Sequence, residues 1–315
     1  MERERAGAPL QTMSDGVLLL MGPTASGKTA LAVELARRFG AEIVSADSRQ
    51  VYRGMAVGTA QPDGAQLARA AHHLLAFLEP EERYSAARFV REATICLDEI
   101  AARGRRAIVV GGTGFYLRAL SGEMALADVA FDESLRARLR EESRLHPQEV
   151  LHAWLLARDA LRAAAVPVAD RYRTLRALEV ALSRGSAPQR ALPTLAARGE
   201  RVLKVALAID RKVLAGRIRE RVRAMIDGGL LAEAESLDGR DAPAADAVGY
   251  PQALAYLRGM CTRAELEEAL TRATLRYAKR QMTWLRREPA LCWVTSGAGA
   301  LAELERSARE SLGWT

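Results

Sequence analysis

The sequence predicts an α/β protein with a parallel sheet at its core and a helical insertion within that core. Short apolar runs alternate with helical patterns in the first third of the 315 residues, as βαβ units require. A glycine-rich loop joins the first apolar run to the helix that follows it. Further along, a long arginine-rich stretch shows helical patterns and no clear strand, which interrupts the alternation.

The core elements of the first third have clear start and stop signals. Gly40 ends the first expected helix, and Ser85 is a helix cap. In chain order we expect a strand over 17–21, a helix over 28–39, a strand over 42–45, a helix from Ser85 through 102 and a strand over 106–110.

The pattern changes after Gly122. Helical stretches continue to a turn near 184–188, a strand resumes over 201–209, and a last strand is expected over 291–294. We therefore divide the chain into a first part of the core over 1–124, a helical insertion over 125–200, and a core completion with basic C-terminal helices over 201–315.

Composition indicates an ordinary globular protein, and its positive net charge favours, without requiring, an anionic partner. The net charge is +7, with 49% hydrophobic and 27% charged residues. A nucleic acid is one explanation of the charge, and phosphorylated metabolites or solubility are others. The three cysteines have no C-x-x-C spacing, which argues against zinc and disulfides. No apolar run is long enough for a membrane span, and we expect a cytoplasmic monomer without a membrane partner.

The glycine-rich loop is Gly22-Pro23-Thr24-Ala25-Ser26-Gly27-Lys28-Thr29, a complete match to the pattern G-x-x-x-x-G-K-S/T. The glycines let successive N–H groups point at phosphate oxygens, and the helix N-terminus adds positive charge. Lys28 adds a full charge, and the Thr29 hydroxyl can face Mg²⁺. The position of the loop between a strand and a helix disfavours a plain turn without a ligand. The fold class is thus a P-loop NTPase-like parallel sheet.

The third strand does not end as it does in nucleotide-hydrolysing P-loop proteins, which carry an aspartate there that holds Mg²⁺. Here the strand runs into Gly111-Gly112-Thr113-Gly114. This absence weakens the ATPase interpretation, although small-molecule kinases can also lack the acid. The glycines fit either the close approach of a ligand or backbone, or a simple turn.

Asp47 directly follows the second strand. The carboxyl ends of parallel strands face a common crevice, so this carboxylate should lie close to the glycine loop. A carboxylate beside a phosphorylated donor is placed to accept a proton from an incoming nucleophile. A helix N-cap or a Mg²⁺ ligand are equally open roles for it.

Arginine-rich segments occur in the insertion and near the C-terminus. A lone basic stripe is usually a solvated face. Two such segments beside a phosphate crevice instead favour a channel for a polyanion. The residues concerned are Arg136, Arg138, Arg140, Arg171, Arg173 and Arg176 in the insertion, and Arg272, Arg276, Lys279, Arg280 and Arg287 near the C-terminus, with Arg217, Arg219, Arg221 and Arg223 between them.

With these segments assembled, the chain resembles the tRNA dimethylallyltransferases over nearly its whole length, from Leu18 to Arg287. The most specific blocks are Ser45-Ala46-Asp47-Ser48-Arg49-Gln50 and Ala278-Lys279-Arg280-Gln281-Met282-Thr283-Trp284. The glycine loop and the blocks at 51–55, 58–60, 72–75, 110–114, 176–180 and 248–250 also match.

The resemblance implies transfer of a dimethylallyl group from dimethylallyl diphosphate to N6 of adenosine 37, next to the tRNA anticodon, with release of diphosphate. It implies that residues 22–29 hold the prenyl diphosphate with Mg²⁺ at Thr29, that Asp47 is the general base, and that Thr24 and Arg217 steady the leaving diphosphate. The implied contacts to the tRNA anticodon stem-loop are Asp47, Ser48, Arg49, Gln50, Thr113, Arg136, Tyr172, Arg173, Thr174, Leu175, Arg176, Lys279, Arg280 and Gln281. The insertion would then be a tRNA-binding lobe.

The chain departs from the family pattern at several positions that are not proposed catalytic residues: Gln61, Ala76, Ala169, Pro251 and Leu275. Three rival functions remain. An adenylate prenyltransferase would share the loop and Asp47 without needing the arginine-rich segments. A small-molecule kinase would use ATP on the loop, and a non-enzymatic tRNA-binding protein would leave the loop and Asp47 without a role.

Overall fold

A computed structural model describes residues 15–124, 126, 132–183 and 191–315. The chain forms two compact units: Met1–Met124 together with Pro193–Thr315, and Ala125–Leu192. The second unit thus ends at Leu192, whereas the sequence pattern placed the end of the insertion at 200. The reason is Leu195, which is fully buried and donates its backbone N–H to the Leu120 carbonyl, 2.8 Å away.

The larger unit is built on a six-stranded parallel sheet of order β3-β2-β4-β1-β5-β6. β1 lies at the centre, with Leu19 opposite Val109 of β4 and Lys204 of β5. The strand β3 was not expected, because two residues are too few to show a pattern. The strands are β1 (Val17–Met21), β2 (Ala41–Ser45), β3 (His72–His73), β4 (Arg106–Gly111), β5 (Val202–Ala208) and β6 (Cys292–Thr295).

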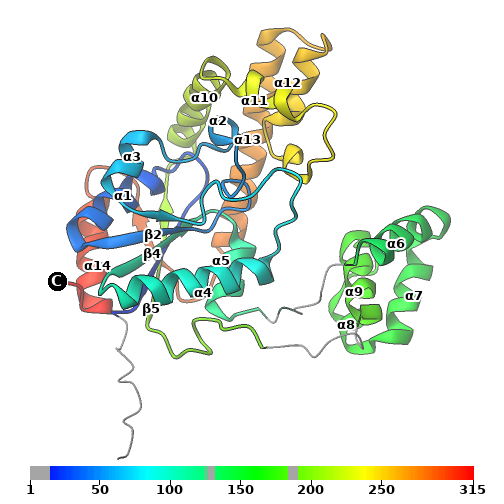
Figure 1. The fold of residues 1–315 in the computed structure, drawn as a ribbon, viewed down its shortest axis with the longest axis horizontal. Coiled ribbons are helices and arrows are strands. Elements are labelled where there is room, and N and C mark those ends of the chain that lie inside the picture. Colours follow the sequence, from blue (N-terminus) through cyan, green and yellow to red (C-terminus); the bar gives the residue numbers. More distant parts are fainter. Residues whose placement is uncertain (1–14, 125, 127–131, 184–190) are drawn as a thin grey trace, which may run out of the picture. The chain divides into compact units, whose positions relative to one another are not determined.

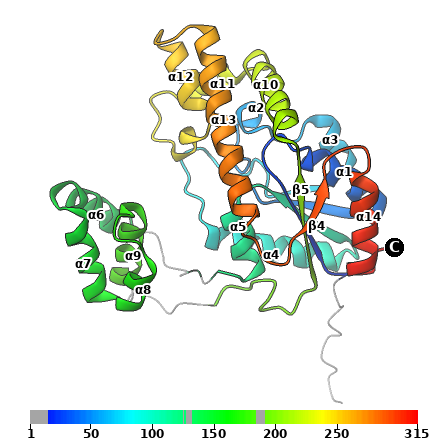
Figure 2. The same ribbon diagram turned by 180° about the vertical axis from the view of Figure 1, so that it is seen from behind.

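Helices cover both faces of this sheet (Figures 1 and 2). On one face, α1 (Lys28–Phe39) and α14 (Ala300–Leu312) bury Leu18, Ile43 and Ile108 against their own apolar residues. On the other face lie α4 (Ala86–Ala102) and α5 (Gly114–Ser121), which pack together. A buried position on both faces explains why the strands are apolar throughout.

A cluster of helices forms a second core of the larger unit. It contains α10 (Arg211–Asp227), α11 (Leu230–Leu237), α12 (Tyr250–Leu257), α13 (Arg263–Leu285) and the 3₁₀ turn η1 (Pro243–Asp246), and the short helix α2 (Ala56–Thr59) packs on α11. The short helix α3 (Gly64–Arg69) packs on α1 instead. Val51, Tyr52 and Met55 are buried in this core. The chain that follows Asp47 is therefore anchored among these helices rather than on the sheet.

The second unit is a small helical bundle. Its helices are α6 (Glu133–Leu145), α7 (Gln148–Arg158), α8 (Ala160–Ala165) and α9 (Arg171–Ser183). Leu139, Leu155 and Leu178 are the centre of its core. None of the helices described in either unit is both long enough and apolar enough to span a membrane.

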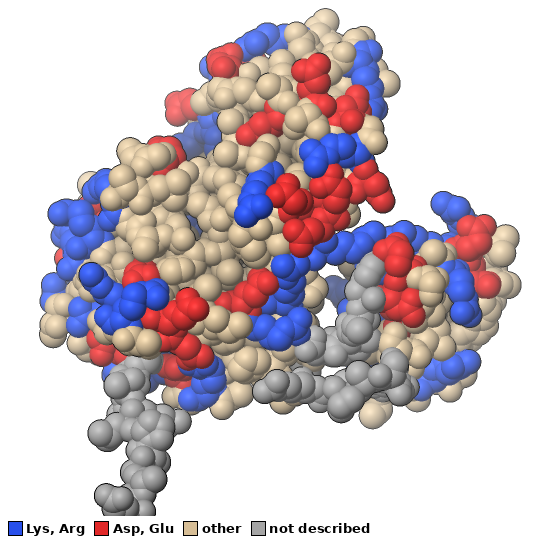
Figure 3. Space-filling view, viewed as in Figure 1, with Lys and Arg blue, Asp and Glu red and all other residues tan. Residues whose placement is uncertain are grey.

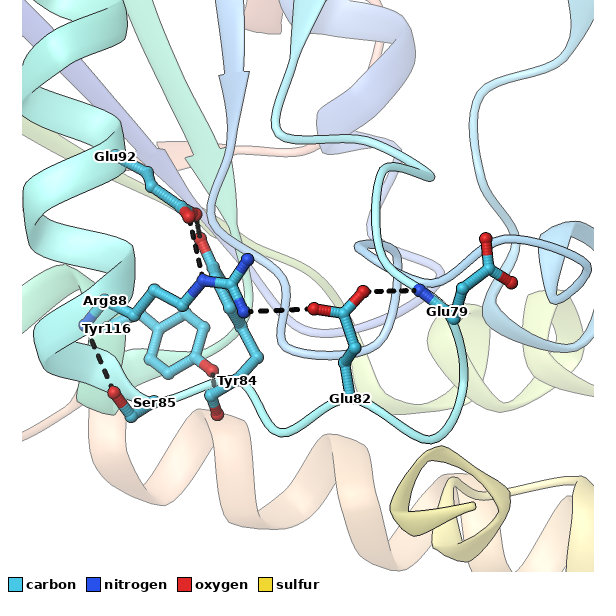
Figure 4. A network of polar contacts seen from close by, with 7 residues as sticks. All are labelled: Glu79, Glu82, Tyr84, Ser85, Arg88, Glu92 and Tyr116. Atoms are coloured by element: carbon cyan, nitrogen blue, oxygen red, sulfur yellow. Dashed lines mark hydrogen bonds and ion pairs between the residues drawn. The ribbon is translucent and has the colours of Figure 1, made fainter. Parts of the chain in front are cut away.

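A network of polar contacts joins the start of α4 to the start of α5 (Figure 4). The Tyr84 hydroxyl donates to Glu92 at 2.7 Å, and Arg88 donates to the other oxygen of that carboxylate at 2.8 Å. Tyr116 of α5 donates to the Tyr84 carbonyl at 3.4 Å and stacks on Phe89, with ring centres 4.8 Å apart. These contacts hold the first turn of α5, which directly follows Thr113.

Candidate active site

The site residues expected in the larger unit meet at the carboxyl edge of the sheet. Gly22 follows β1, Asp47 follows β2 and Thr113 follows β4, and these three strands are neighbours in the order β2-β4-β1. Ser296 follows β6 at the same edge. This is the edge at which parallel α/β sheets bind ligands.

The glycine loop has the backbone that a phosphate cradle needs. Gly27 has φ 89° and Ala25 has φ 63°, which are left-handed conformations that bend the chain sharply. A side chain at Gly22 would place its Cβ 2.7 Å from the Ser26 hydroxyl. That hydroxyl is buried and has no hydrogen-bond partner among the described residues, so a bound ligand could form a hydrogen bond with it.

Two distant elements tie the loop in place. Arg217 of α10 donates to the Ser26 carbonyl at 3.2 Å, and the Ser296 hydroxyl donates to the same carbonyl at 3.0 Å. The Lys28 ammonium donates to the Pro23 carbonyl at 3.4 Å. The expected position of Arg217 beside the loop is thus observed, while Ser296 was not expected from the sequence.

Positive charge is concentrated around the loop. The pKa of Lys28 is lowered to about 8, mainly by burial; the charge of Asp47 acts in the opposite direction, and the charge of Arg221 adds to the lowering. Burial likewise lowers the pKa of Arg221. Within the described part of the chain, Arg221 forms no ion pair or hydrogen bond. Cations held out of water without a matching number of acids indicate an anionic ligand.

Asp47 uses one carboxylate oxygen to shape its own turn. Oδ1 accepts from the backbone N–H of Arg49 at 2.9 Å and of Gln50 at 3.4 Å. Oδ2 accepts no hydrogen bond from the described residues. Asp47 lines a pocket together with Lys28 and Thr29. Asp47 therefore stabilises a turn and not the start of a helix, because the next helix begins at Ala56, and its second oxygen is left open for the role of base.

The glycines after β4 are explained by close packing of the chain. A Cβ at Gly111 would lie 2.2 Å from the Ala46 carbonyl oxygen, and one at Gly114 would lie 2.2 Å from the Trp284 ring. At Gly112 it would lie 2.2 Å from the Gln281 amide nitrogen. Of the two open interpretations, the close approach of other parts of the chain applies here.

Gln281 has an internal position rather than the expected contact with tRNA. Its side chain is buried, its oxygen accepts from the Thr24 backbone N–H at 2.8 Å, and its nitrogen donates to the Gly112 carbonyl at 3.0 Å. It therefore bridges the glycine loop and the end of β4. We reassign it as a positioning residue, because both ends of its amide are engaged within the protein.

Gln50 is also held by the protein itself. Its side-chain nitrogen donates to the carbonyls of Thr59, at 3.2 Å, and Ala60, at 2.8 Å, at the end of α2. At the start of α2, the Glu233 carboxylate accepts from the N–H groups of Val57 and Gly58, both at 2.8 Å. The sequence pattern did not single out Glu233.

Some of the other expected tRNA contacts of the larger unit form bonds within the protein, and others are exposed. Arg49 donates to the Pro243 carbonyl at 3.2 Å and pairs with Asp246 at 2.6 Å. The Ser48 N–H donates to the Thr113 hydroxyl at 3.2 Å. Lys279 and Arg280 are exposed on α13. Acidic and basic side chains are interspersed over the face in Figure 3, so the net charge does not form one uniformly basic surface there.

In the second unit the expected contacts divide into exposed and internal residues. Tyr172 and Arg173 are exposed. The guanidinium groups of Arg136 and Arg176 both pair with the buried Glu179, at 3.0 and 2.6 Å. Thr174 is fully buried and Leu175 packs on the bundle core. We therefore assign these last four residues to the stability of the bundle, because their side chains are occupied there.

Histidine and tyrosine side chains near Asp47 were missed by the sequence reasoning about the site. His72 lines the same pocket as Asp47, and burial lowers its pKa. Burial and the charge of Asp47 raise the pKa of Tyr277 above its ordinary value. The only sequence signal for His72 was its place in the matching block 72–75. Tyr277 lies seven residues before Trp284, a helical spacing that is also typical of core residues.

The residues present fit a magnesium ion bound together with a diphosphate. The described residues contain no group of three or more His, Cys, Asp or Glu side chains that could hold a metal alone. Thr29 lines the pocket with Asp47, and the buried Ser26 hydroxyl and His72 Nε2 lack partners among the described residues. A hard cation that takes most of its ligands from phosphate and water suits this set.

The fold and the site together define a P-loop protein that binds a phosphorylated ligand beside a carboxylate. The family model for IPP transferase matches residues 50–288, and the one for isopentenyl transferase matches 15–76. The tRNA dimethylallyltransferase of Anaeromyxobacter sp. (strain K) is 46% identical over 286 residues, which cover 88% of this chain and 92% of that protein. The Geobacter sulfurreducens enzyme of the same name is 41% identical over 284 residues, or 88% and 91%.

Solved structures agree with these relatives. The tRNA isopentenylpyrophosphate transferase of Bacillus halodurans has a TM-score of 0.70 and 34% identity, over 95% of this chain and 97% of that one. A eukaryotic dimethylallyltransferase has a TM-score of 0.73 at 22% identity, over 93% and 76% of the chains, which supports the fold. The chain belongs to the tRNA dimethylallyltransferase family. The predicted family, the P-loop NTPase-like fold class and the prenyltransferase class are thereby confirmed.

Proposed function

We propose that this protein transfers the dimethylallyl group of dimethylallyl diphosphate to N6 of adenosine 37 in tRNA and releases diphosphate. The observation that carries the proposal is the free Oδ2 of Asp47 in the pocket of Lys28 and Thr29, at a sheet edge where β4 ends in glycines instead of an acid. Family membership supports the tRNA substrate.

The residues of the chain have three roles in this reaction: they neutralise the leaving diphosphate, accept a proton from N6 and hold the loop in position. The bond between C1 of the prenyl group and its diphosphate oxygen breaks, and its electron pair leaves with the diphosphate. The N–H groups of the loop, Lys28 and Arg217 neutralise the charge that develops there, with Arg221 nearby. N6 bonds to C1, and its proton passes to Asp47 Oδ2. The backbone turn at Thr24 is held for this task by Gln281.

Magnesium is the proposed cofactor. The Thr29 hydroxyl would hold the ion beside the diphosphate, where the ion would supply further positive charge against the leaving oxygens.

The proposed partner is the anticodon stem-loop of tRNA. Because N6 of a stacked adenine is shielded, the base must leave the loop stack to reach Asp47. Lys279 and Arg280 on α13, and Tyr172 and Arg173 on α9, are the expected contacts that the structure leaves exposed. We propose that the protein acts as a cytoplasmic monomer.

Labelled dimethylallyl diphosphate distinguishes the proposed function from its rivals. With Mg²⁺ and unmodified tRNA, we expect label on adenosine 37 and none on AMP supplied at the same concentration. Equal or preferential labelling of AMP would establish an adenylate prenyltransferase instead. Phosphate transfer from ATP without prenyl transfer would establish a kinase.

The role of Asp47 is tested by Asp47→Asn. Asparagine keeps an oxygen acceptor for the turn at Arg49 and Gln50 and removes the basic carboxylate. We expect kcat to fall by about 10²–10⁴-fold, with the Kd for tRNA changed less than twofold. Asp63→Asn is the matched control, because Asp63 caps α3 outside the site. A loss of tRNA affinity in Asp47→Asn, with kcat retained, would make Asp47 an RNA contact.

A further inference from the structure

The strand β3 carries two adjacent histidines that face opposite sides of the sheet. His72 pairs with Ile43 and His73 pairs with Val44, in a parallel register. Residues paired in this way point to the same face. Ile43 belongs to the core beneath α1, so His72 lies on the α1 face. His73 lies on the other face, where its Nε2 contacts Glu42 at 2.7 Å.

The hydrogen bonds of the His72 ring define which nitrogen is free. Nδ1 lies 2.8 Å from the Ala70 carbonyl oxygen. A carbonyl only accepts, so Nδ1 carries the hydrogen, and Nε2 of the neutral ring is an acceptor. Nε2 is buried and has no partner among the described residues. A buried acceptor without a partner is destabilising, so a donor next to Nε2 would be favoured.

The space next to the ring has room for one water molecule. His72 lines a cavity of about 20 Å³ with the polar residues Lys28, Thr29, Ser45, Asp47 and Gln50. A buried water needs at least about 10–15 Å³ and two to four polar partners, and this cavity offers both. Asp47 and Thr29, which the proposed function assigns to the base and the metal, line this same cavity, so a water held by His72 would lie beside them.

We propose that His72 Nε2 accepts a hydrogen bond from a water molecule in this cavity, and that this water is a ligand of the magnesium ion at Thr29. The inference rests on the proposed function, which places magnesium beside the loop. His72 is then a positioning residue for the metal, supplied by the edge strand β3. Groups that orient metal ligands in this way typically change metal affinity by about 10–100-fold when they are removed.

The substitution His72→Asn isolates the acceptor. The asparagine amide can still donate to the Ala70 carbonyl in place of Nδ1, but it has no group at the position of Nε2. His73→Asn is the matched control, because it removes the same ring from the next residue on the opposite face. Thermal melts of both variants check that the fold is kept.

The measurement is a calorimetric titration of Mg²⁺ into the protein saturated with dimethylallyl S-thiolodiphosphate, an analogue that resists transfer, without tRNA. We expect the Kd for Mg²⁺ to rise at least tenfold in His72→Asn and less than twofold in His73→Asn. Binding of the analogue in EDTA should be the same in all three proteins, because the acceptor acts only through the metal-bound water.

Three outcomes would overturn the inference. The first is an unchanged Kd for Mg²⁺ in His72→Asn, and the second is a rise of this Kd in His73→Asn as large as that in His72→Asn. The third is a loss of analogue binding by His72→Asn in EDTA as large as its loss of Mg²⁺ affinity. The titration contains no tRNA, so its result is separate from the test of the proposed function. If the wild-type protein does not prenylate tRNA but His72→Asn still weakens Mg²⁺ binding, the metal site stands and the proposed function fails.

Discussion

The lowered pKa of Lys28 predicts that binding of the prenyl diphosphate weakens as the pH rises from 7 to 9. With a pKa of about 8, the protonated fraction of Lys28 falls from about nine tenths at pH 7 to about one tenth at pH 9. If only the protonated form binds the diphosphate, the apparent Kd rises about tenfold over this interval. An unperturbed lysine, with a pKa of 10.5, would leave the Kd unchanged.

The lowered pKa of Lys28 makes the free energy of unfolding increase with pH, whereas it makes ligand binding weaken with pH. The folded-state pKa is lowered, so between about pH 8 and 10.5 the unfolded chain holds a proton on Lys28 that the folded chain has lost. This group therefore makes the ligand-free protein more stable as the pH rises through that window. A loss of binding without a loss of stability separates the titration of Lys28 from alkaline unfolding.

Calorimetry of the thiolodiphosphate analogue at pH 7 and pH 9 measures both the Kd and the protons taken up. The bound diphosphate keeps Lys28 protonated, so at pH 9 binding should take up about 0.9 proton, seen as a difference between buffers of unlike ionisation enthalpy. The control is Lys28→Arg, whose charge does not titrate in this range. A wild-type Kd that changes less than twofold, or the same slope in Lys28→Arg, would refute the reasoning.

Three further predictions concern packing, a buried ion cluster and RNA binding. Gly114→Ala should lower the free energy of unfolding by about 1–3 kcal/mol because its methyl group would meet the Trp284 ring, and Gly64→Ala, with no atom near the added methyl, should be neutral in the same urea titration. Lys204→Met should lower the free energy of unfolding by about 3–5 kcal/mol, because it removes the cation that Glu123 and the buried Glu288 share and leaves Glu288, among the described cations, only Arg118, 3.6 Å away; a loss below 1 kcal/mol would contradict this. Arg280→Ala should weaken tRNA binding and lower its salt slope by about 1, while Arg306→Ala on α14 leaves both unchanged.

The sequence predicts best the elements that depend on neighbouring residues. The first helix was expected over 28–39 and occurs at Lys28–Phe39, and Ser85 caps α4 as expected. The glycine loop and Asp47 were recognised because a strand followed by a specific turn leaves a local pattern. The position of Asp47 at the same edge as the loop followed from the rule for parallel strands.

The sequence pattern did not predict contacts between residues that are distant in the chain. Gln281 lies 257 residues from Thr24, and nothing in its own helix tells whether it faces RNA or the loop. Arg136 and Arg176 look like free charges in the sequence, yet both pair with the buried Glu179. An arginine pattern predicts charge but not whether an acid neutralises it.

The sequence by itself determined the phosphate-binding loop, the carboxylate beside it and the family to which they belong. Only the tertiary structure decided that the loop is held by Gln281, Arg217 and Ser296, and that His72 faces it from an edge strand of two residues. The physical reason is the separation along the chain between the residues that interact. Helix and strand periodicity, caps and loop conformation are local properties, whereas burial and hydrogen-bond partners arise only when the chain is folded.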